Sequence, residues 1–193
     1  SFEFLYLDNK LENLSQIIIM NTKLALEILN KDIKMRNLIK VYGLPCFEPK
    51  NDYFKSLMHS IVFQQLNGKV ANIIYQRLIS LLPNNKIIPR EVLMLNNENM
   101  RQAGLSLQKI NYIKNLADYF NNNLFTRDIV EKMSNEEISK ELIQIKGIGP
   151  WTVDMFLIFS IGKSNIFPKG DLGFVKAIAK SYKKKLPVSD IFL

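Results

Sequence analysis

Apolar residues recur three and four positions apart along most of the chain, a spacing that places them on one face of an α-helix. The stretches with this period are Leu14–Leu29, Phe54–Phe63, Val70–Leu82, Ile110–Phe120, Ile138–Ile145 and Val153–Ile161. No stretch alternates apolar and polar residues convincingly, as a half-buried β-strand does. The pattern therefore predicts an all-α protein.

Polar residues at the expected helix starts support this interpretation. Glu137 follows Ser134 at the spacing of a capping box, in which each side chain accepts a hydrogen bond from the other residue's backbone N–H. Asp32, and either Asn51 or Asp52, stand at two further helix starts, where a short polar side chain satisfies free backbone N–H groups. These residues predict where three of the helices begin.

The chain has 193 residues, of which 47% are hydrophobic, enough for one domain or two closely packed lobes. The longest apolar runs, at 16–20 and 155–159, are far shorter than the ~20 residues of a membrane-spanning helix, so we expect no membrane partner. The first residues lack the basic start and cleavage site of a signal peptide. They also lack an initiating Met, so we expect a fragment or a processed form.

Cysteine and histidine each occur once. A single cysteine, Cys46, excludes an internal disulfide, an all-cysteine zinc site and a four-cysteine iron–sulfur cluster, and it fits a reducing compartment. We expect Cys46 to be an ordinary core or surface residue. His59 lies inside a helical apolar pattern and is interpreted as a packing residue, so catalysis by a Ser–His or Cys–His pair has no supporting motif.

The charge balance favours a polyanionic partner. The formal net charge is +8 and the pI is about 9.5. From residue 163 onward the acids are Asp171 and Asp190. The lysines in the same segment are Lys163, Lys169, Lys176, Lys180, Lys183, Lys184 and Lys185. An isolated acid within a basic tail is a more particular pattern than general basicity.

A glycine-rich turn joins two of the expected helices. Lys146 and Gly147 follow the capped helix, Ile148 and Gly149 complete the turn, and a new helix begins at Pro150. The two glycines permit a tight turn with positive φ, Ile148 can enter the core, and proline suits the first helical position. Backbone N–H groups of such a turn can bind a phosphate. The residues alone leave two interpretations open, a phosphate-binding hairpin and a simple corner between helices.

Together with three further segments, this turn resembles a known family. Residues 146–152 are similar to the helix-hairpin-helix of the base-excision DNA glycosylases, the HhH-GPD superfamily, and most similar to its alkylbase branch, the 3-methyladenine DNA glycosylase II-like enzymes. The other matching segments are 60–71, 103–117 and 167–173. The resemblance implies a two-lobed helical bundle with a cleft between the lobes.

The resemblance also implies an activity. Asp171 occupies the place of the family's catalytic carboxylate, so we expect a hydrolase that flips a damaged base out of double-stranded DNA and breaks its N-glycosidic bond. Trp151 stands where strand-cleaving relatives carry a nucleophilic lysine, which implies a monofunctional enzyme. Its ring would offer a π-face to cationic bases such as 3-methyladenine and 7-methylguanine. From the residues alone, Asp171 also suits the N-cap of a helix at 172–181.

Further site residues follow from the same resemblance. Tyr112 is expected near the base pocket with Trp151, Gln64 is expected to support the turn that follows it, and Leu66 or Asn67 would fill the gap left by the flipped base. The expected DNA contacts are Lys146, Gly147, Ile148, Gly149, Thr152, Lys169, Gln65, Leu66 and Asn67. The backbone carbonyls expected to hold a structural Na⁺ or K⁺ are those of Ile143, Ile145 and Gly147. No cofactor is expected to be required.

Alternatives stay open. The same fold could act on another lesion, such as uracil or hypoxanthine, or the chain could be a DNA-binding helix-hairpin-helix protein without catalysis. We expect one all-α unit composed of N-terminal helices (1–50), a helical lobe (51–145), the hairpin (142–162) and a catalytic-aspartate segment (163–193). The family's usual further helix is missing, so the C-terminus is expected to be truncated. We expect a monomer in the bacterial cytoplasm or nucleoid, or in the eukaryotic nucleus.

Overall fold

The computed structural model describes residues 23–44, 50, 52–163 and 165–188. The chain divides into two units, Ser1–Cys46 with Ala177–Val188, and Phe47–Lys176 with Ser189–Leu193. Helices and their connections make up all the described residues, and no strand occurs among them, which confirms the all-α prediction. Cys46 and residues 14–22 of the first expected helix lie outside the described residues.

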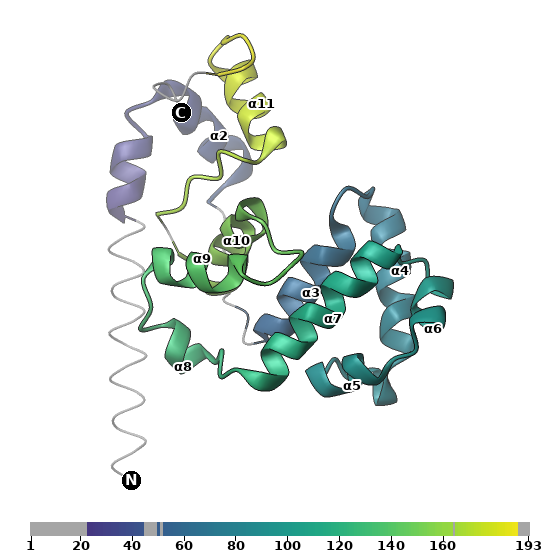
Figure 1. Cartoon of the computed structure of the whole chain (residues 1–193). Helices are drawn as coiled ribbons and strands as arrows, with labels where there is room; N and C mark the ends of the chain where they lie inside the picture. The colour runs from purple at the N-terminus through teal and green to yellow at the C-terminus, as the bar shows by residue number, and fades with distance from the viewer. Residues whose placement is uncertain (1–22, 45–49, 51, 164, 189–193) are drawn as a thin grey trace. The chain divides into compact units, whose positions relative to one another are not determined.

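The second unit holds most of the helices (Figure 1). In chain order they are α3 (Tyr53–Phe63), α4 (Gly68–Ser80), the 3₁₀ turn η1 (Pro83–Asn85), α5 (Pro89–Met94), α6 (Asn97–Gln102), α7 (Leu107–Asn122), α8 (Arg127–Val130), α9 (Asn135–Ile143), α10 (Pro150–Phe156) and the π-helical turn η2 (Leu157–Ile161). The first unit contains α2 (Ile33–Tyr42). Helix α11 (Leu172–Ser181) begins in the second unit and ends in the first.

The core of the second unit is built around α7, which packs against α3 and α5 (Figure 1). Leu57 and Ile61 of α3 and Ile110 and Ile113 of α7 are completely buried. Full burial of one such side chain contributes about 1.5–3 kcal/mol. The same core receives Ile138 and Leu142 from α9 and Val153 and Phe156 from α10, so the hairpin helices are fixed on a rigid base.

The helix starts agree with the sequence. Ser134 Oγ accepts from the Glu137 N–H at 3.2 Å, and the Glu137 carboxylate accepts from the Ser134 N–H at 2.7 Å, which confirms the capping box. Asp32 caps α2 by accepting from the N–H groups of residues 34 and 35. Of the two alternatives for α3, Asp52 is the cap.

His59 is a packing residue, as expected. Its ring stacks on Phe63 with centroids 3.9 Å apart and meets the edge of Tyr75 at 4.9 Å. Burial lowers the pKa of His59, which keeps the ring neutral at physiological pH. None of the helices in the described part of the chain is long and apolar enough to span a membrane.

Candidate DNA-binding and catalytic site

The turn between α9 and α10 is constrained from inside the protein at Gly147. Its φ of +110° lies in a region that side-chain-bearing residues rarely adopt. A Cβ at this position would also lie 2.3 Å from Cγ of Tyr112, which packs against the turn from α7. Ile148 is only 5% exposed and inserts into the core, as predicted. The turn therefore requires glycine at position 147.

Gly149 differs from Gly147. Its φ is −105° and its ψ is 172°, so the prediction of positive φ is right for Gly147 and wrong for Gly149. A Cβ at Gly149 would meet no atom within 4 Å. Nothing inside the described protein therefore requires a glycine there, and open space remains beside the first N–H groups of α10, which begins at Pro150.

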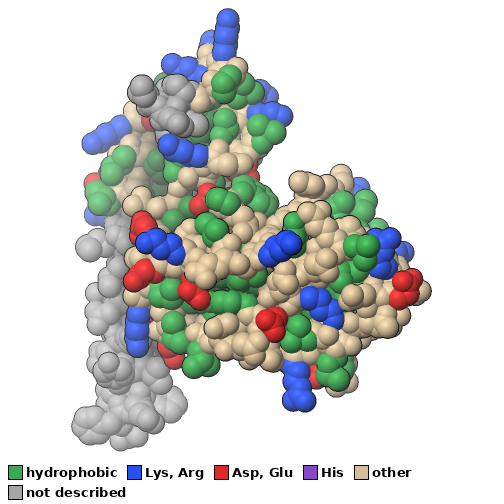
Figure 2. All heavy atoms as spheres, in the orientation of Figure 1, with side chains coloured by type: hydrophobic (Ala, Val, Ile, Leu, Met, Phe, Trp, Pro, Cys, Tyr) green, Lys and Arg blue, Asp and Glu red, His purple; other side chains and the backbone are tan. Residues whose placement is uncertain are grey.

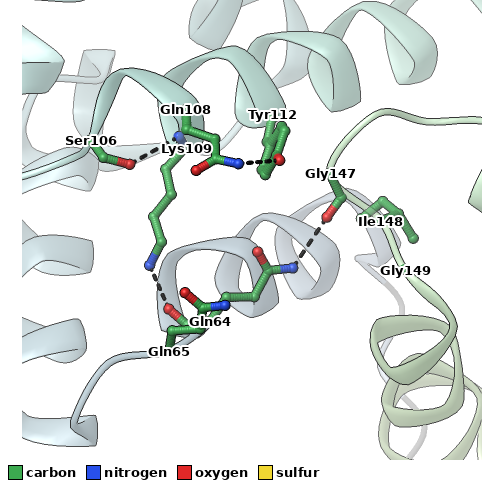
Figure 3. A pocket seen from close by; sticks show the side chains of 9 residues that line it. All are labelled: Gln64, Gln65, Ser106, Gln108, Lys109, Tyr112, Gly147, Ile148 and Gly149. Atoms are coloured by element: carbon green, nitrogen blue, oxygen red, sulfur yellow. Dashed lines mark hydrogen bonds between the residues drawn. The ribbon is translucent and has the colours of Figure 1, made fainter. Parts of the chain in front are cut away.

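Gln64, at the C-terminal end of α3, fastens the hairpin. Its Nε2 donates to the carbonyl of Gly147 at 3.1 Å (Figure 3). The same nitrogen lies 3.2 Å from Oγ1 of Thr152. The structural role expected for Gln64 is confirmed. Thr152 is only 2% exposed, and its expected contact with DNA stays a prediction. Its hydroxyl is used to join α10 to α3.

A polar cavity of about 410 Å³ lies between the end of α3, the start of α7 and the hairpin (Figure 3). Its lining residues are Gln64, Gln65, Ser106, Gln108, Lys109, Tyr112, Gly147, Ile148 and Gly149. The Tyr112 hydroxyl accepts from Nε2 of Gln108 at 2.6 Å. Trp151 is not among the residues that line this cavity, and the base pocket expected for Trp151 and Tyr112 stays a prediction.

Asp171 is held by two hydrogen bonds from different elements. The Trp151 indole Nε1–H donates to Oδ2 at 2.8 Å, and the backbone N–H of Phe174 donates to Oδ1 at 2.7 Å. The second bond makes Asp171 the N-cap of α11, so the capping interpretation is confirmed. Because the cap and Trp151 use opposite oxygens, the carboxylate plane is fixed.

The same donors keep Asp171 ionised. The N–H of Phe174, the indole of Trp151 and, more weakly, the N–H of Gly173 lower the pKa of Asp171, against a smaller opposing effect of burial. Trp151 is 37% exposed and Asp171 is partly exposed, so a ligand can reach both. The arrangement is an oriented carboxylate beside an accessible aromatic face.

Gln64, which directly follows α3, is followed by three more residues before α4 begins, and we call these three, Gln65, Leu66 and Asn67, the α3–α4 loop. Gln65 has a φ of +55°, which is uncommon for a residue other than glycine. The Asn67 side chain accepts from the N–H of Lys69 at 2.9 Å and caps α4. Leu66 is 39% exposed. Of the two candidates for the DNA-inserting side chain, Leu66 is therefore the one that is not engaged as a helix cap.

Residues 58–191 match the HhH-GPD superfamily base excision DNA repair protein profile. The DNA-3-methyladenine glycosylase 1 of Schizosaccharomyces pombe is 34% identical over 169 residues, covering 84% of this chain and 73% of that protein. The chain belongs to the HhH-GPD superfamily of base excision DNA repair proteins.

Solved structures of HhH-GPD members agree. The S. pombe 3-methyladenine DNA glycosylase in complex with abasic DNA has a TM-score of 0.76 and 30% identity, covering 85% of this chain and 82% of that one. A DNA-3-methyladenine glycosidase from Bacillus halodurans has a TM-score of 0.71 and 31% identity, covering 82% and 73%. The chain spans about half the length of other relatives, 51% of the putative Bacillus subtilis DNA-3-methyladenine glycosylase YfjP and 48% of the Saccharomyces cerevisiae DNA-3-methyladenine glycosylase.

The basic residues of this HhH-GPD protein are spread out. Figure 2 shows Lys and Arg side chains scattered among polar and apolar ones on the face in view. Lys146 and Lys169 are exposed, at the hairpin and shortly before Asp171. Positive charge alone therefore does not mark the site on this face.

Two of the three carbonyls expected to bind a monovalent cation already have hydrogen-bond partners. Ile145 O accepts from the N–H of Ile148 at 2.9 Å, and Gly147 O accepts from Gln64. A carbonyl oxygen has two lone pairs, so each keeps one for a cation. No cluster of three or more acidic, histidine or cysteine ligands occurs among the described residues. The cation site of Ile143, Ile145 and Gly147 stays a prediction.

Proposed function

We propose that the protein is a monofunctional DNA glycosylase that removes alkylated bases, such as 3-methyladenine and 7-methylguanine, from double-stranded DNA. The observation that carries the proposal is the ionised, doubly held carboxylate of Asp171 beside Trp151. Membership of a base excision repair superfamily and the named activities of the relatives support it.

Asp171 suits the chemistry of N-glycosidic bond hydrolysis. As the bond breaks, its electron pair goes to the base and positive charge develops on the sugar. A fixed carboxylate stabilises that charge and can orient the attacking water, whose oxygen bonds to C1′ while its proton passes to the carboxylate or to solvent. A cationic alkylated base leaves as a neutral molecule, so the reaction needs no strong general acid. No acid other than Asp171 is assigned a catalytic role.

Trp151 has two roles in this proposal. Its N–H orients Asp171, and its accessible ring offers a face on which a cationic base can stack. Because position 151 carries no amine, the enzyme has no nucleophile there to form a Schiff base with the sugar. The product is therefore an intact strand with an abasic site.

DNA would be bound from several sides of the second unit. The hairpin N–H groups beside Gly149, with Lys146 and Lys169, would contact phosphates, and the α3–α4 loop would insert Leu66 where the base has left. We further propose that the chain acts as a monomer. The hairpin carbonyls would hold Na⁺ or K⁺, which would strengthen phosphate binding.

Base release from duplexes carrying 7-methylguanine or 3-methyladenine tests the proposal, with the wild type and Asp171→Asn side by side. We expect release by the wild type alone, with strand breaks appearing only after alkali treatment. Asp171→Asn should keep its DNA affinity, because the amide oxygen still accepts one of the two hydrogen bonds and the substitution removes a negative charge that would repel DNA. Release from uracil or hypoxanthine duplexes instead would reassign the lesion. Tight binding without release from any duplex would identify a DNA-binding protein without catalysis.

A further inference from the structure

Lys109 does not extend into solvent. From the first turns of α7 its side chain crosses to the end of α3 (Figure 3). There, Nζ donates to the carbonyls of Val62 at 2.6 Å and Gln64 at 2.8 Å. The side chain is partly buried, and burial lowers the pKa of Lys109. Among the described residues no carboxylate forms an ion pair with it. The ammonium is therefore committed to backbone carbonyls.

These two carbonyls lie at the C-terminal end of α3, where a positive charge is stabilising. The last carbonyls of a helix have no intrahelical partner and carry a partial negative charge. Immediately after Gln64 the chain turns sharply at Gln65, whose φ is +55°. A non-glycine residue in this conformation is strained and persists only where its surroundings hold it. Lys109 provides such a hold directly before the turn.

The location adds a second consequence. Lys109 lines the cavity between the α3–α4 loop and the hairpin, and both are proposed to contact DNA. The negative end of α3 is thus directed toward the site of a polyanion, which is unfavourable unless it is neutralised. An ammonium has three N–H donors, and two are used on the carbonyls. One N–H donor of Lys109 therefore remains at the cavity wall.

We propose that Lys109 is a positioning residue that holds the α3–α4 loop in its DNA-inserting conformation and neutralises the end of α3 beneath the bound strand. This inference rests on the proposed function, because the loop matters to catalysis only if it enters damaged DNA. In this role Lys109 would touch neither the damaged base nor the sugar. It acts through Gln65 and Leu66.

The chain provides a matched control on the same helix. Lys114 donates from Nζ to the carbonyls of Leu93 at 2.5 Å and Leu95 at 2.7 Å, at the end of α5. It is also partly buried, and burial also lowers its pKa. It differs from Lys109 in its position, because it lines neither the cavity nor the α3–α4 loop. A purely structural role predicts the same behaviour for both lysines.

The experiment compares Lys109→Met, Lys114→Met and Lys109→Arg in the full chain. Methionine keeps most of the aliphatic length and removes the charge, whereas arginine restores charge and donors. Urea unfolding should show a similar loss for both methionine variants. Single-turnover release of 7-methylguanine should fall about tenfold in Lys109→Met, as for loss of a hydrogen bond from a charged group, and less than about twofold in Lys114→Met. Lys109→Arg should recover most of the rate.

Two readouts do not depend on base release. Hydrogen exchange of the Leu66 amide, which donates to Phe63 O at 3.3 Å, should accelerate in Lys109→Met and not in Lys114→Met. With a non-cleavable abasic-analogue duplex carrying 2-aminopurine beside the lesion, Lys109→Met should show a smaller fluorescence change. Equal behaviour of the two methionine variants in both readouts overturns the inference. Absence of base release by the wild type instead overturns the proposed function.

Discussion

Replacing Trp151 with Phe keeps an aromatic ring and removes the indole N–H that reaches Asp171 at 2.8 Å. A hydrogen bond to a charged group contributes about 1.5–3 kcal/mol when shielded from water. Trp151 is 37% exposed, so water replaces part of the lost interaction, and we expect a cost of ~1 kcal/mol. That corresponds to a rate of base release about fivefold lower.

The sign of the pH effect follows from the pKa. Trp151 is one of the donors that lower the pKa of Asp171, so its loss raises that pKa toward the ordinary value. In the proposed function base release needs the ionised carboxylate, so its rate should fall as the pH drops through the pKa of Asp171. The acidic limb of the single-turnover pH profile should therefore lie at higher pH in Trp151→Phe than in the wild type.

The lowered pKa of Asp171 also makes folding stability depend on pH. A lowered folded-state pKa stabilises the protein above the unfolded-state pKa, and this contribution is lost as pH falls through the folded value. Trp151→Phe should therefore lose less stability on acidification than the wild type, as measured by urea unfolding. Trp151→Leu lacks both the N–H and the aromatic ring, whereas Trp151→Phe lacks only the N–H. Comparing the two variants separates stacking from hydrogen bonding. An unchanged acidic limb in Trp151→Phe, with a wild-type rate, would refute the reasoning.

Three glycine substitutions test other parts of the site. Gly147→Ala should destabilise the fold by about 2 kcal/mol or more, because Cβ meets Tyr112 at a positive φ, as measured by urea unfolding. Gly149→Ala should leave stability within about 0.5 kcal/mol and weaken DNA binding severalfold, because only a ligand approaches that side; unchanged affinity would argue against a phosphate there. Gly173→Ala places a Cβ 3.1 Å from Oδ1 of Asp171, so base release should slow while stability is kept or gained from helix propensity; a wild-type rate would show that the carboxylate tolerates the shift.

The sequence predicts α3, α4, α7, α9 and α10 because each buries two or more residues of an apolar face. Helices α5, α6 and α8 bury one residue each, Val92, Met100 and Val130, so none of the three has a period to detect. The last turn after α10 is π-helical rather than α-helical, a difference of one residue per turn that the apolar spacing does not encode.

For the site, the sequence predicts the positions of the key residues but not the contacts between them. The positions of Trp151 and Asp171 were identified from the family resemblance, whereas their hydrogen bond depends on how the segment before α11 folds back onto α10. Glycine at 147 and at 149 looks alike in sequence, although one is required by φ and the other has free space. The commitment of Lys109 to the end of α3 also depends on packing between segments distant in sequence.

Hydrogen bonds link the parts of the site that would contact DNA within the second unit. Lys109 binds the backbone carbonyl of Gln64, and the Gln64 side chain binds both the hairpin and Thr152. Thr152 is buried, which fixes the rotation of α10 and leaves its neighbour Trp151 directed outward to Asp171. The loop that would fill the gap in the duplex and the carboxylate that would act on the sugar are thus set by the same end of α3. Because both are held by one rigid element, insertion of the loop and placement of the carboxylate need no separate adjustment when DNA binds.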